Sequence, residues 1–327
     1  MAHDRIRRQP LSEFSLIDSL RARVNVARHD VALGIGDDAA LLKVQADRQL
    51  VACTDTLVAG VHFLHETAPE DIGWKSLAVN LSDLAAMGAD PAWALLALTL
   101  PKPDKGFVEH FAQGFAELAR AHHVALVGGD TTQGPLSISV TALGSVPAGA
   151  ALQRGSAQIG DAVFVTGTLG DAAGALRRLQ GDGQVPAGLR ERLDRPQPRV
   201  SAGIALRGVA NACIDVSDGL LADLGHVCAA SRVGAELEAD ALPLSPGLLA
   251  AFDGAICRQL ALSGGDDYEL CFTVPVADES RIARLLAQAG CAATRIGRIV
   301  AGSGVRVVDA HGHDVTPSQI GWEHFTP

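Results

Sequence analysis

The sequence predicts an α+β fold, in which strand-like and helix-like segments alternate but several strands follow one another directly. Apolar residues recur at helical spacing in some segments and form short strand-like runs in others. The strand-like runs at 39–44 and 50–56, and those at 124–127 and 136–146, have no helix between them. A doubly wound parallel sheet would need a crossover helix between most of its strands, so the α+β class is favoured.

The first half of the chain contains helices and strands in alternation. Apolar residues at helical spacing predict a helix over 12–24. The segment Thr67-Ala-Pro-Glu70 has the spacing of a capping box and predicts a helix that runs to about Met87 and stops at Gly88. A further helix is predicted over 107–121. The predicted strands are 39–44, 50–56, 92–100, 124–127 and 136–146.

The second half begins after a stretch rich in Gly, Ala and Pro. This stretch lies near 147–160 and predicts a boundary between two α/β domains, 1–148 and 149–327. A loop is predicted over 181–188. The predicted helices are 170–179, 200–210, 219–230 and 280–289. The predicted strands are 162–166, 213–215, 268–274, 295–299 and 305–308.

The composition is typical of a soluble, acidic globular protein. Of 327 residues, 48% are hydrophobic and 20% are charged, with a formal net charge of −10. This balance leaves no broad basic surface for nucleic acid or an anionic membrane. Residues 1–20 have no continuous apolar core and the run at 92–100 is too short to span a bilayer, so a cytoplasmic location is expected. Six cysteines without CxxC spacing predict reduced, mostly buried thiols rather than a zinc site.

Aspartates that follow a small residue form the most informative pattern. Glycine lets the backbone approach a ligand closely, and a carboxylate is a hard oxygen donor. If the fold gathers these acids, their mutual repulsion requires cations among them, which predicts several Mg²⁺ ions that handle phosphate. The segments are Gly36-Asp37-Asp38, Thr54-Asp55, Ser82-Asp83, Gly129-Asp130, Asp215-Val216-Ser217-Asp218 and Gly264-Gly265-Asp266-Asp267.

Three of these segments also have a purely structural interpretation. The stretch 34–38 has the composition of a turn, whatever its function. Ser217 or Asp218 would be a sufficient N-cap for the helix that follows. Asp130 would end a strand and start a turn with the next residue.

Asp83 and His62 need separate consideration. Asp83 lies among apolar residues of a predicted helix, where a carboxylate needs a metal or another partner, such as Lys75 or the backbone. His62 lies alone between a strand and a loop, where a histidine is more often structural than catalytic. The sequence contains no P-loop, kinase, EF-hand, HExxH or GxSxG motif.

Six segments in order span nearly the whole chain. They are GIGDDAALL (34–42), TDTLVAGVHF (54–63), KSLAVNLSDLAAMGADP (75–91), GGDTTQGPLS (128–137), DVSDGLLADLGH (215–226) and SGGDDYELCF (263–272). Together they resemble the thiamine-monophosphate kinase family. This family is part of a superfamily of ATP-binding enzymes that includes aminoimidazole ribonucleotide synthetase and selenophosphate synthetase. The resemblance implies that ATP and thiamine monophosphate are converted to ADP and thiamine diphosphate.

The resemblance also implies an architecture and a set of site residues. The N-terminal α/β domain would carry the metal and nucleotide site and contribute strands to a β-barrel that spans a homodimer, and the C-terminal α/β domain would close over the nucleotide. The implied magnesium ligands are Asp38, Thr54, Asp55, Asp83, Asp130, Asp215 and Asp218, with the backbone of Cys53. The implied ATP contacts are Gly129, Asp130, Arg154 and Ser217. The implied contacts to thiamine monophosphate are His62, Asp266 and Trp322.

The chain departs from the family pattern at two of these positions. The family usually has Ser where this chain has Cys53, which changes little if only the carbonyl oxygen binds metal. It usually has Glu where this chain has Asp266, and the shorter acid would need a water or a loop shift to reach the substrate.

The charges of the two reactants predict direct transfer. The acceptor is a phosphate monoester whose second pKa is about 6, so near neutral pH it is a nucleophile that needs no dedicated general base. Two unit charges about 4 Å apart repel each other by about 4 kcal/mol at an effective dielectric near 20. Mg²⁺ ions held by carboxylates would offset this repulsion, with metal-bound Asp55, Asp83 and Asp130 central to the chemistry.

Two other functions stay open. The chain could be another enzyme of the same superfamily. Selenophosphate synthetase would need a reactive Cys or selenocysteine in a Gly-rich N-terminal loop, whereas Cys53 lies in a predicted strand. A non-catalytic protein that binds a nucleotide or Ca²⁺ would use the same carboxylates.

Overall fold

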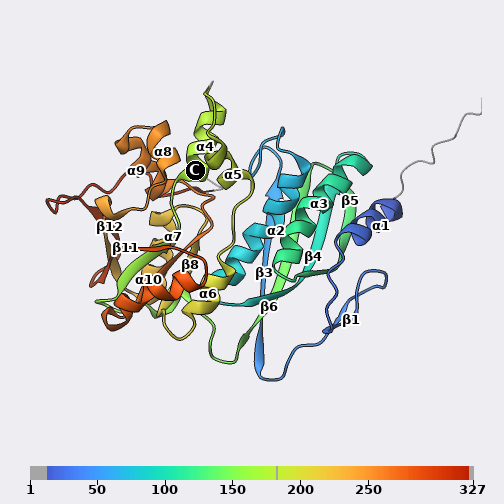
Figure 1. Cartoon of the computed structure of the whole chain (residues 1–327), viewed down its shortest axis with the longest axis horizontal. Coiled ribbons are helices and arrows are strands. Elements are labelled where there is room, and N and C mark those ends of the chain that lie inside the picture. The colour runs from blue at the N-terminus through green and yellow to red at the C-terminus, as the bar shows by residue number, and fades with distance from the viewer. Residues whose placement is uncertain (1–12, 182, 324–327) are drawn as a thin grey trace, which may run out of the picture. The chain divides into compact units, whose positions relative to one another are not determined.

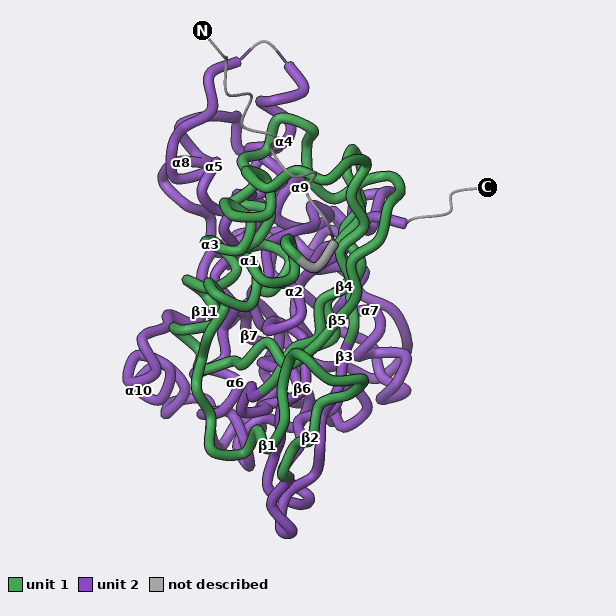
Figure 2. Tube along the Cα trace, turned by 90° about the vertical axis from the view of Figure 1, so that its right-hand side faces the viewer, with its two compact units in different colours: residues 1–43, 54–77, 93–141 green, residues 44–53, 78–92, 142–327 purple. Residues whose placement is uncertain are grey.

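The structure is a computed structural model, and it describes residues 13–181 and 183–323. Within it the chain separates into two compact units (Figure 2). Unit 1 contains the described residues of 1–43, 54–77 and 93–141, and unit 2 contains those of 44–53, 78–92 and 142–327. Each unit is therefore assembled from stretches that are far apart in the sequence.

The first half of the chain contains three helices and one four-stranded sheet among its described residues (Figure 1). The sheet has the strand order β3-β6-β4-β5, and β4 and β5 are parallel. A separate two-stranded antiparallel sheet pairs β1 with β2. The elements are α1 (Glu13–Arg23), β1 (Val31–Leu33), β2 (Leu41–Leu42), β3 (Arg48–Val58), α2 (Pro69–Ala86), β4 (Asp90–Leu100), α3 (Lys105–Ala121), β5 (Ala125–Gln133) and β6 (Ser137–Pro147).

Helices α2 and α3 approach closely because each has a glycine at the contact. A Cβ on Gly73 would overlap the carbonyl group of Phe111, and a Cβ on Gly114 would overlap the carbonyl group of Glu70. Helix α3 begins after Asp104, whose side chain accepts a hydrogen bond from a backbone N–H of the first turn at 3.0 Å. This bond satisfies one of the donors that a helix N-terminus leaves unpaired.

The second half of the chain builds a six-stranded, mostly antiparallel sheet. Its strand order is β12-β9-β11-β7-β10-β8, and the one parallel pair within it is β12 with β9. The strands are β7 (Ala162–Thr166), β8 (Ala212–Val216), β9 (Gly234–Glu238), β10 (Glu269–Val274), β11 (Ala293–Val300) and β12 (Gly304–Val308). The helices are α4 (Asp171–Gln180), α5 (Ala187–Asp194), α6 (Val200–Leu206), α7 (Leu220–Ser231), α8 (Pro246–Ala251), α9 (Gly254–Ser263) and α10 (Glu279–Gln288).

The core of unit 2 lies between this sheet and α7, which packs against β8, β9 and β12 (Figure 1). Leu220 and Leu224 of α7 are fully buried there. Burial of a leucine side chain typically stabilises a fold by about 1.5–3 kcal/mol. Phe164 of β7 and Phe272 of β10 are register partners, and their rings stack at 5.6 Å. This packing fixes the ends of β8 and β10, which carry the candidate site.

The mixed helix and strand fold confirms the sequence prediction in outline. The predicted strand 162–166 is β7, and the predicted helices 107–121 and 219–230 match α3 and α7 to within two residues at each end. Helix α2 ends at Ala86, just before Gly88 with φ 65°. All six cysteines are reduced, with no disulfide among them, and five are buried, as expected. None of the helices among the described residues is long and apolar enough to cross a bilayer.

Several predicted boundaries are wrong. The predicted strand 39–44 is reduced to Leu41–Leu42, and the predicted strand 124–127 continues to Gln133. The predicted loop 181–188 already contains the start of α5. Helices α5, α8 and α9 and strand β9 were not predicted. Elements of five to ten residues contain too few turns or alternations for a clear periodic signal.

Candidate functional site

The turn between β8 and α7 is the centre of the candidate site in unit 2. Asp215 is buried at the end of β8, and its Oδ2 accepts a hydrogen bond from the buried Ser82 Oγ at 2.7 Å. Asp83, the next residue of α2, is half-buried. The structure therefore links two of the predicted segments, 75–91 and 215–226, although they are more than a hundred residues apart.

Asp223 of α7 organises this turn. Its Oδ2 accepts hydrogen bonds from the backbone N–H groups of Ser217 and Asp218 at 3.0 Å and of Gly219 at 3.2 Å. The residue at the N-cap position of α7 is Gly219, with φ 119°, and no side chain caps this helix. The interpretation of Ser217 or Asp218 as the N-cap is therefore wrong. Instead, the carboxylate of Asp223, in the first turn of α7, accepts the hydrogen bonds from the backbone N–H groups of the turn.

Negative charge is concentrated at the turn. Burial, together with the nearby carboxylates of Asp215 and Asp218, raises the pKa of Asp223 to about 7. Carboxylate oxygens in this arrangement are hard donors of the kind that divalent cations prefer. Asp223 was not singled out in the sequence, although it lies within the segment 215–226. The available signal was an acid among the leucines at the start of a mostly apolar helix.

The loop 264–268 lies beside this turn. The N–H of Asp266 donates to the carbonyl oxygen of Ser217 at 2.8 Å, and the N–H of Tyr268 donates to that of Val216 at 2.8 Å. A Cβ on Gly265 would come within 2.6 Å of the same Ser217 oxygen, so this position requires glycine. Asp266 is thereby held next to Ser217.

The C-terminal segment reaches the same turn. The N–H of Trp322 donates to the carbonyl oxygen of Asp218 at 2.9 Å, and the side chain of Trp322 is 55% exposed. The hydroxyl group of Ser263 also donates to the carbonyl oxygen of Gln319 at 2.5 Å. Four predicted site residues from three distant segments, Ser217, Asp218, Asp266 and Trp322, therefore come together in unit 2.

The predicted residues of β3 and β5 are positioned by their strands in unit 1. Thr54 Oγ1 donates to the carbonyl oxygen of Val140 at 3.1 Å, and Asp55 is the next residue of β3. Asp130 lies within β5 opposite Ala97, so the interpretation that it ends a strand is wrong. The strand continues because Gly129, with φ 149°, fits against β4 where a Cβ would overlap a backbone carbonyl group.

The other predicted residues lie in turns and short segments. The backbone N–H of Asp38 donates to Asp37 Oδ1 at 2.8 Å in an exposed turn. His62 Nδ1 accepts a hydrogen bond from the N–H of Val58 at 3.0 Å. The carbonyl oxygen of Arg154, in a 3-10 turn at 154–156, accepts a hydrogen bond from Ser231 Oγ at 2.9 Å, and Arg154 is exposed.

The predicted magnesium ligands are divided between the two units. Unit 1 contains Asp38, Thr54, Asp55 and Asp130, and unit 2 contains Cys53, Asp83, Asp215 and Asp218. In the described part of the chain, no group of three or more His, Cys, Asp or Glu side chains is disposed to hold a metal ion. The assembly of these ligands into one centre therefore stays a prediction.

Comparison with known proteins places the chain in a family. Residues 36–146 match the N-terminal domain of AIR synthase related protein, and residues 158–310 match its C-terminal domain. The thiamine-monophosphate kinase of Salmonella typhimurium is 47% identical over 319 residues, which is 96% of this chain and 98% of that protein.

Two solved structures agree with this placement. The crystal structure of thiamine-monophosphate kinase from Stenotrophomonas maltophilia K279a is 54% identical, with a TM-score of 0.85, and the match covers 91% of this chain and 97% of that one. The structure of AaThiL complexed with AMPPCP and TMP is 35% identical, with a TM-score of 0.77, covering 96% of this chain and 97% of that one. The chain accordingly belongs to the thiamine-monophosphate kinase family.

Proposed function

We propose that the protein transfers the γ-phosphoryl group of ATP to thiamine monophosphate, which yields ADP and thiamine diphosphate. The observation that carries this proposal is the convergence of Ser217, Asp218, Asp266 and Trp322 at the end of β8. It is supported by relatives named as thiamine-monophosphate kinases and by a 35% identical structure that holds AMPPCP and TMP. Such a reaction would serve the biosynthesis of thiamine diphosphate.

The donor set fits Mg²⁺. Its members offer carboxylate, hydroxyl and carbonyl oxygens, and the crowding of acids around Asp223 would be relieved by a divalent cation. When bound, several Mg²⁺ ions would neutralise charge on the phosphates of both reactants. The proposed ligands are Asp38, Thr54, Asp55, Asp83, Asp130, Asp215 and Asp218 and the carbonyl oxygen of Cys53.

The remaining proposed roles concern the two substrates. Gly129, Asp130, Arg154 and Ser217 would contact ATP. Gly129 would contact ATP through its backbone, and the Arg154 guanidinium group, which lies on an exposed turn, can pair with phosphate oxygens. His62, Asp266 and Trp322 would contact thiamine monophosphate, for which the exposed indole ring offers a stacking surface.

The transfer itself would be direct and in line, without a phosphoenzyme. The acceptor phosphate has a second pKa of about 6 and is already a nucleophile near neutral pH. The task of the protein is to hold two anions that repel each other by about 4 kcal/mol at about 4 Å. The carboxylates of Asp55, Asp83 and Asp130 would act by fixing positive charge between these anions, and no side chain has to remove a proton.

We also propose the architecture implied by the family. The domains would be 1–148 and 149–327, and the matched domain ranges 36–146 and 158–310 support this division. A cytoplasmic homodimer, with strands of both N-terminal domains in one β-barrel, would be the working form. Sedimentation of the purified protein tests the dimer directly.

The decisive experiment is a coupled assay of ADP release with Mg²⁺, in the presence and absence of thiamine monophosphate. We expect release that depends strictly on thiamine monophosphate and stops when EDTA removes the metal. Turnover with a different acceptor would favour another enzyme of the superfamily. Nucleotide binding without turnover on any acceptor would favour a binding protein and contradict the proposal.

Asp83 tests the assignment of metal ligands. Asp83→Asn should lower kcat by about 100-fold or more, because it removes one of the charges that hold the metal, while the thermal transition changes little. The control is Asp240→Asn, because the Asp240 side chain is 63% exposed in unit 2 and should leave kcat unchanged. Turnover of Asp83→Asn at the wild-type rate would reject the assignment.

A further inference from the structure

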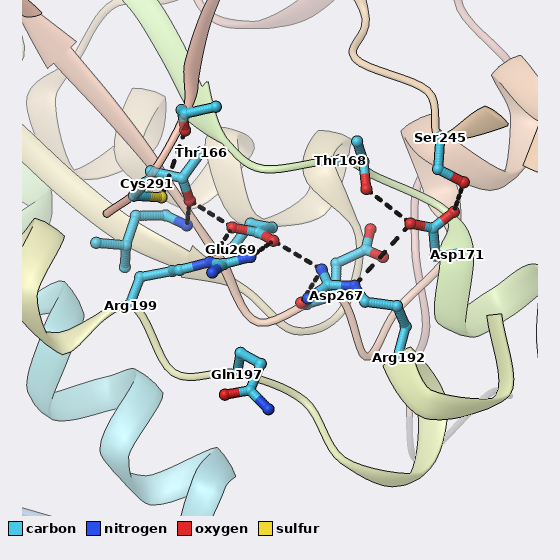
Figure 3. Close-up of polar contacts among 12 residues, drawn as sticks. Thr166, Thr168, Asp171, Arg192, Gln197, Arg199, Ser245, Asp267, Glu269 and Cys291 are labelled. Carbon is cyan, nitrogen blue, oxygen red and sulfur yellow. Dashed lines mark hydrogen bonds and ion pairs between the residues drawn. The ribbon is translucent and has the colours of Figure 1, made fainter. Parts of the chain in front are cut away.

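Glu269 is a fully buried carboxylate at the start of β10, directly after the loop 264–268. Its Oε2 accepts hydrogen bonds from Thr166 Oγ1 at 2.6 Å and from Arg199 Nε at 2.7 Å. Its Oε1 accepts hydrogen bonds from Arg192 Nη2 at 2.7 Å and Arg199 Nη2 at 2.5 Å (Figure 3). A buried carboxylate without such partners would be costly, and here two arginines and a threonine supply them.

Arg192 connects this buried carboxylate to the loop. Its Nη2 also donates to the carbonyl oxygen of Asp267 at 3.2 Å. The side chain of Asp267, which is 1% exposed, accepts hydrogen bonds from the N–H of Gly170 at 3.0 Å and 2.9 Å. Gly170 is at the N-cap position of α4. The middle of the loop is therefore fixed through its backbone by Arg192 (Figure 3) and through its side chain by Gly170.

The residues on either side of Asp267 have an unusual backbone conformation. Asp266 has φ 68° and Tyr268 has φ 50°, in the left-handed region that residues other than glycine adopt at a cost. Such conformations persist where the surrounding contacts determine them, as the contacts of Asp267 do here. The loop is thus held in a shape that its own sequence does not favour.

In this conformation the side chain of Tyr268 contacts the side chain of Asp266. Tyr268 Oη donates a hydrogen bond to Asp266 Oδ1 at 2.9 Å, and the side chain of Tyr268 is only 7% exposed. A buried ring has little freedom to rotate, so its hydroxyl group restrains the position of Asp266 Oδ1. Asp266 itself lies beside Ser217, at the centre of the candidate site.

We propose that Tyr268 is a positioning residue for the substrate. Its hydroxyl group orients the Asp266 carboxylate toward thiamine monophosphate, and the Arg192–Glu269 pair holds the loop in the conformation that makes this hydrogen bond possible. The inference rests on the proposed function, because it takes Asp266 as a substrate contact. It adds a residue that affects the binding of thiamine monophosphate, through Asp266, and does not affect the binding of ATP.

The first test is Tyr268→Phe, which removes one oxygen atom and keeps the ring in the core. We expect KM for thiamine monophosphate to rise by about 3- to 10-fold, the usual effect of one lost hydrogen bond. KM for ATP and the thermal transition should stay close to the wild-type values. A purely structural role would instead lower the thermal transition and leave KM for thiamine monophosphate unchanged.

A double-mutant cycle separates action through Asp266 from an independent effect. Both Asp266→Asn and the double variant Asp266→Asn/Tyr268→Phe are measured for KM. If Tyr268 acts through the carboxylate, the tyrosine substitution should have little further effect once Asp266 is altered. Effects that multiply in full would overturn the proposal, as would a wild-type KM in Tyr268→Phe.

Two further variants test the loop anchor. Arg192→Lys keeps the charge but cannot bridge Glu269 and the Asp267 carbonyl in the same way, so KM for thiamine monophosphate should rise while KM for ATP does not. The matched control is Ser245→Ala, which removes a hydrogen bond of 2.5 Å to Asp171 at the far side of the same network. It should lower stability and leave both KM values unchanged. If Arg192→Lys changed both KM values equally, Arg192 would not act specifically on the binding of thiamine monophosphate.

Direct binding of thiamine monophosphate by calorimetry distinguishes this inference from the proposed function. A wild-type protein that neither binds nor turns over this compound overturns the proposed function and the inference with it. A wild-type protein that turns it over, with a Tyr268→Phe variant that binds it equally well, overturns the inference alone. Weaker binding by Tyr268→Phe, at unchanged affinity for the ATP analogue AMPPCP, supports both.

Discussion

Asp266 and Asp267 are chemically identical neighbours, but their surroundings differ. Asp266 is half-buried beside the β8–α7 turn, whereas Asp267 is 1% exposed and accepts hydrogen bonds from Gly170. Burial raises the pKa of Asp267 well above its ordinary value, against the opposing effects of the Gly170 hydrogen bond and the Arg192 charge. The Gly-Gly-Asp-Asp sequence indicated the first acid as a site residue. It contained no signal that the second acid anchors the loop, because that depends on α4, almost a hundred residues away.

The raised pKa of Asp267 predicts a pH-dependent stability. A carboxyl group whose pKa is higher in the folded state stabilises the fold at low pH, and this contribution is lost as pH rises from about 4 toward the raised value. Asp267→Asn removes the titration but keeps an acceptor for Gly170. The stability of the wild type relative to this variant should therefore be greater at about pH 5 than at about pH 8. Urea unfolding at both pH values measures it, and an equal difference at the two would contradict the assignment.

Single elements depend on contacts that local sequence does not reveal. Strand β5 was predicted to stop at 127, and the two residues that follow, Gly128 and Gly129, are poor strand formers. It continues because the pair allows the backbone of β5 to approach β4 closely. The same glycines were predicted to let the backbone approach a phosphate, whereas in the structure the backbone at Gly129 lies against strand β4. Tertiary contact therefore decided this boundary, and local propensity did not.

Gly129→Ala should destabilise the protein by about 2–4 kcal/mol, because the new Cβ would overlap the Leu96 carbonyl group at an unfavourable φ. The matched control is Gly188→Ala in α5, where a Cβ would meet no atom within 4 Å. That change should be neutral or stabilising by up to about 1 kcal/mol. Chemical denaturation of both variants compares them, and equal stabilities would contradict the close packing of β5 on β4.

Strand β9 offers an electrostatic prediction. Glu236 is the register partner of Arg298 on β11 and of Arg306 on β12, and hydrogen bonds from Arg306 and then Arg298 lower its pKa. A lowered pKa contributes stability that is present at neutral pH and is lost as pH falls through the folded value. Glu236→Gln should cost up to about 1 kcal/mol near pH 7 and less near pH 3. Urea unfolding of the wild type and the variant at both pH values measures this cost. An equal cost at the two pH values would show that the ionised Glu236 carboxylate is not its cause.

For the whole molecule, the sequence predicted the mixed fold and most of the residues that gather at the end of β8. The site residues could be proposed from the sequence because they lie in six ordered segments that resemble one family. The supporting residues were not predicted. Asp223 accepts hydrogen bonds from the turn just before its own helix, and Arg192 and Glu269 pair with each other from different elements. A charged residue in a helix or strand is as consistent with a solvated surface as with a buried partner.

The six thiols predict a simple chemical behaviour of the folded protein. Cys53 is the one cysteine that is not buried, and burial raises the pKa of the Cys228 thiol to about 11. Because the thiolate is the reactive form, a thiol reagent should modify Cys53 first in the native state and all six after unfolding. Cys53→Ser should abolish the fast native reaction. Rapid modification of several thiols in the native protein would contradict the compact core of unit 2.

The hydrogen bond from Trp322 to Asp218 has an optical consequence. Trp74 and Trp93 are 8% and 3% exposed, whereas Trp322 is 55% exposed. Of the three indole rings, only that of Trp322 is open to a collisional quencher such as iodide, and it is attached to the turn where we place the substrates. The fluorescence of the protein therefore contains one red-shifted emitter at the end of β8, and its quenching follows the occupancy of that turn without any added label.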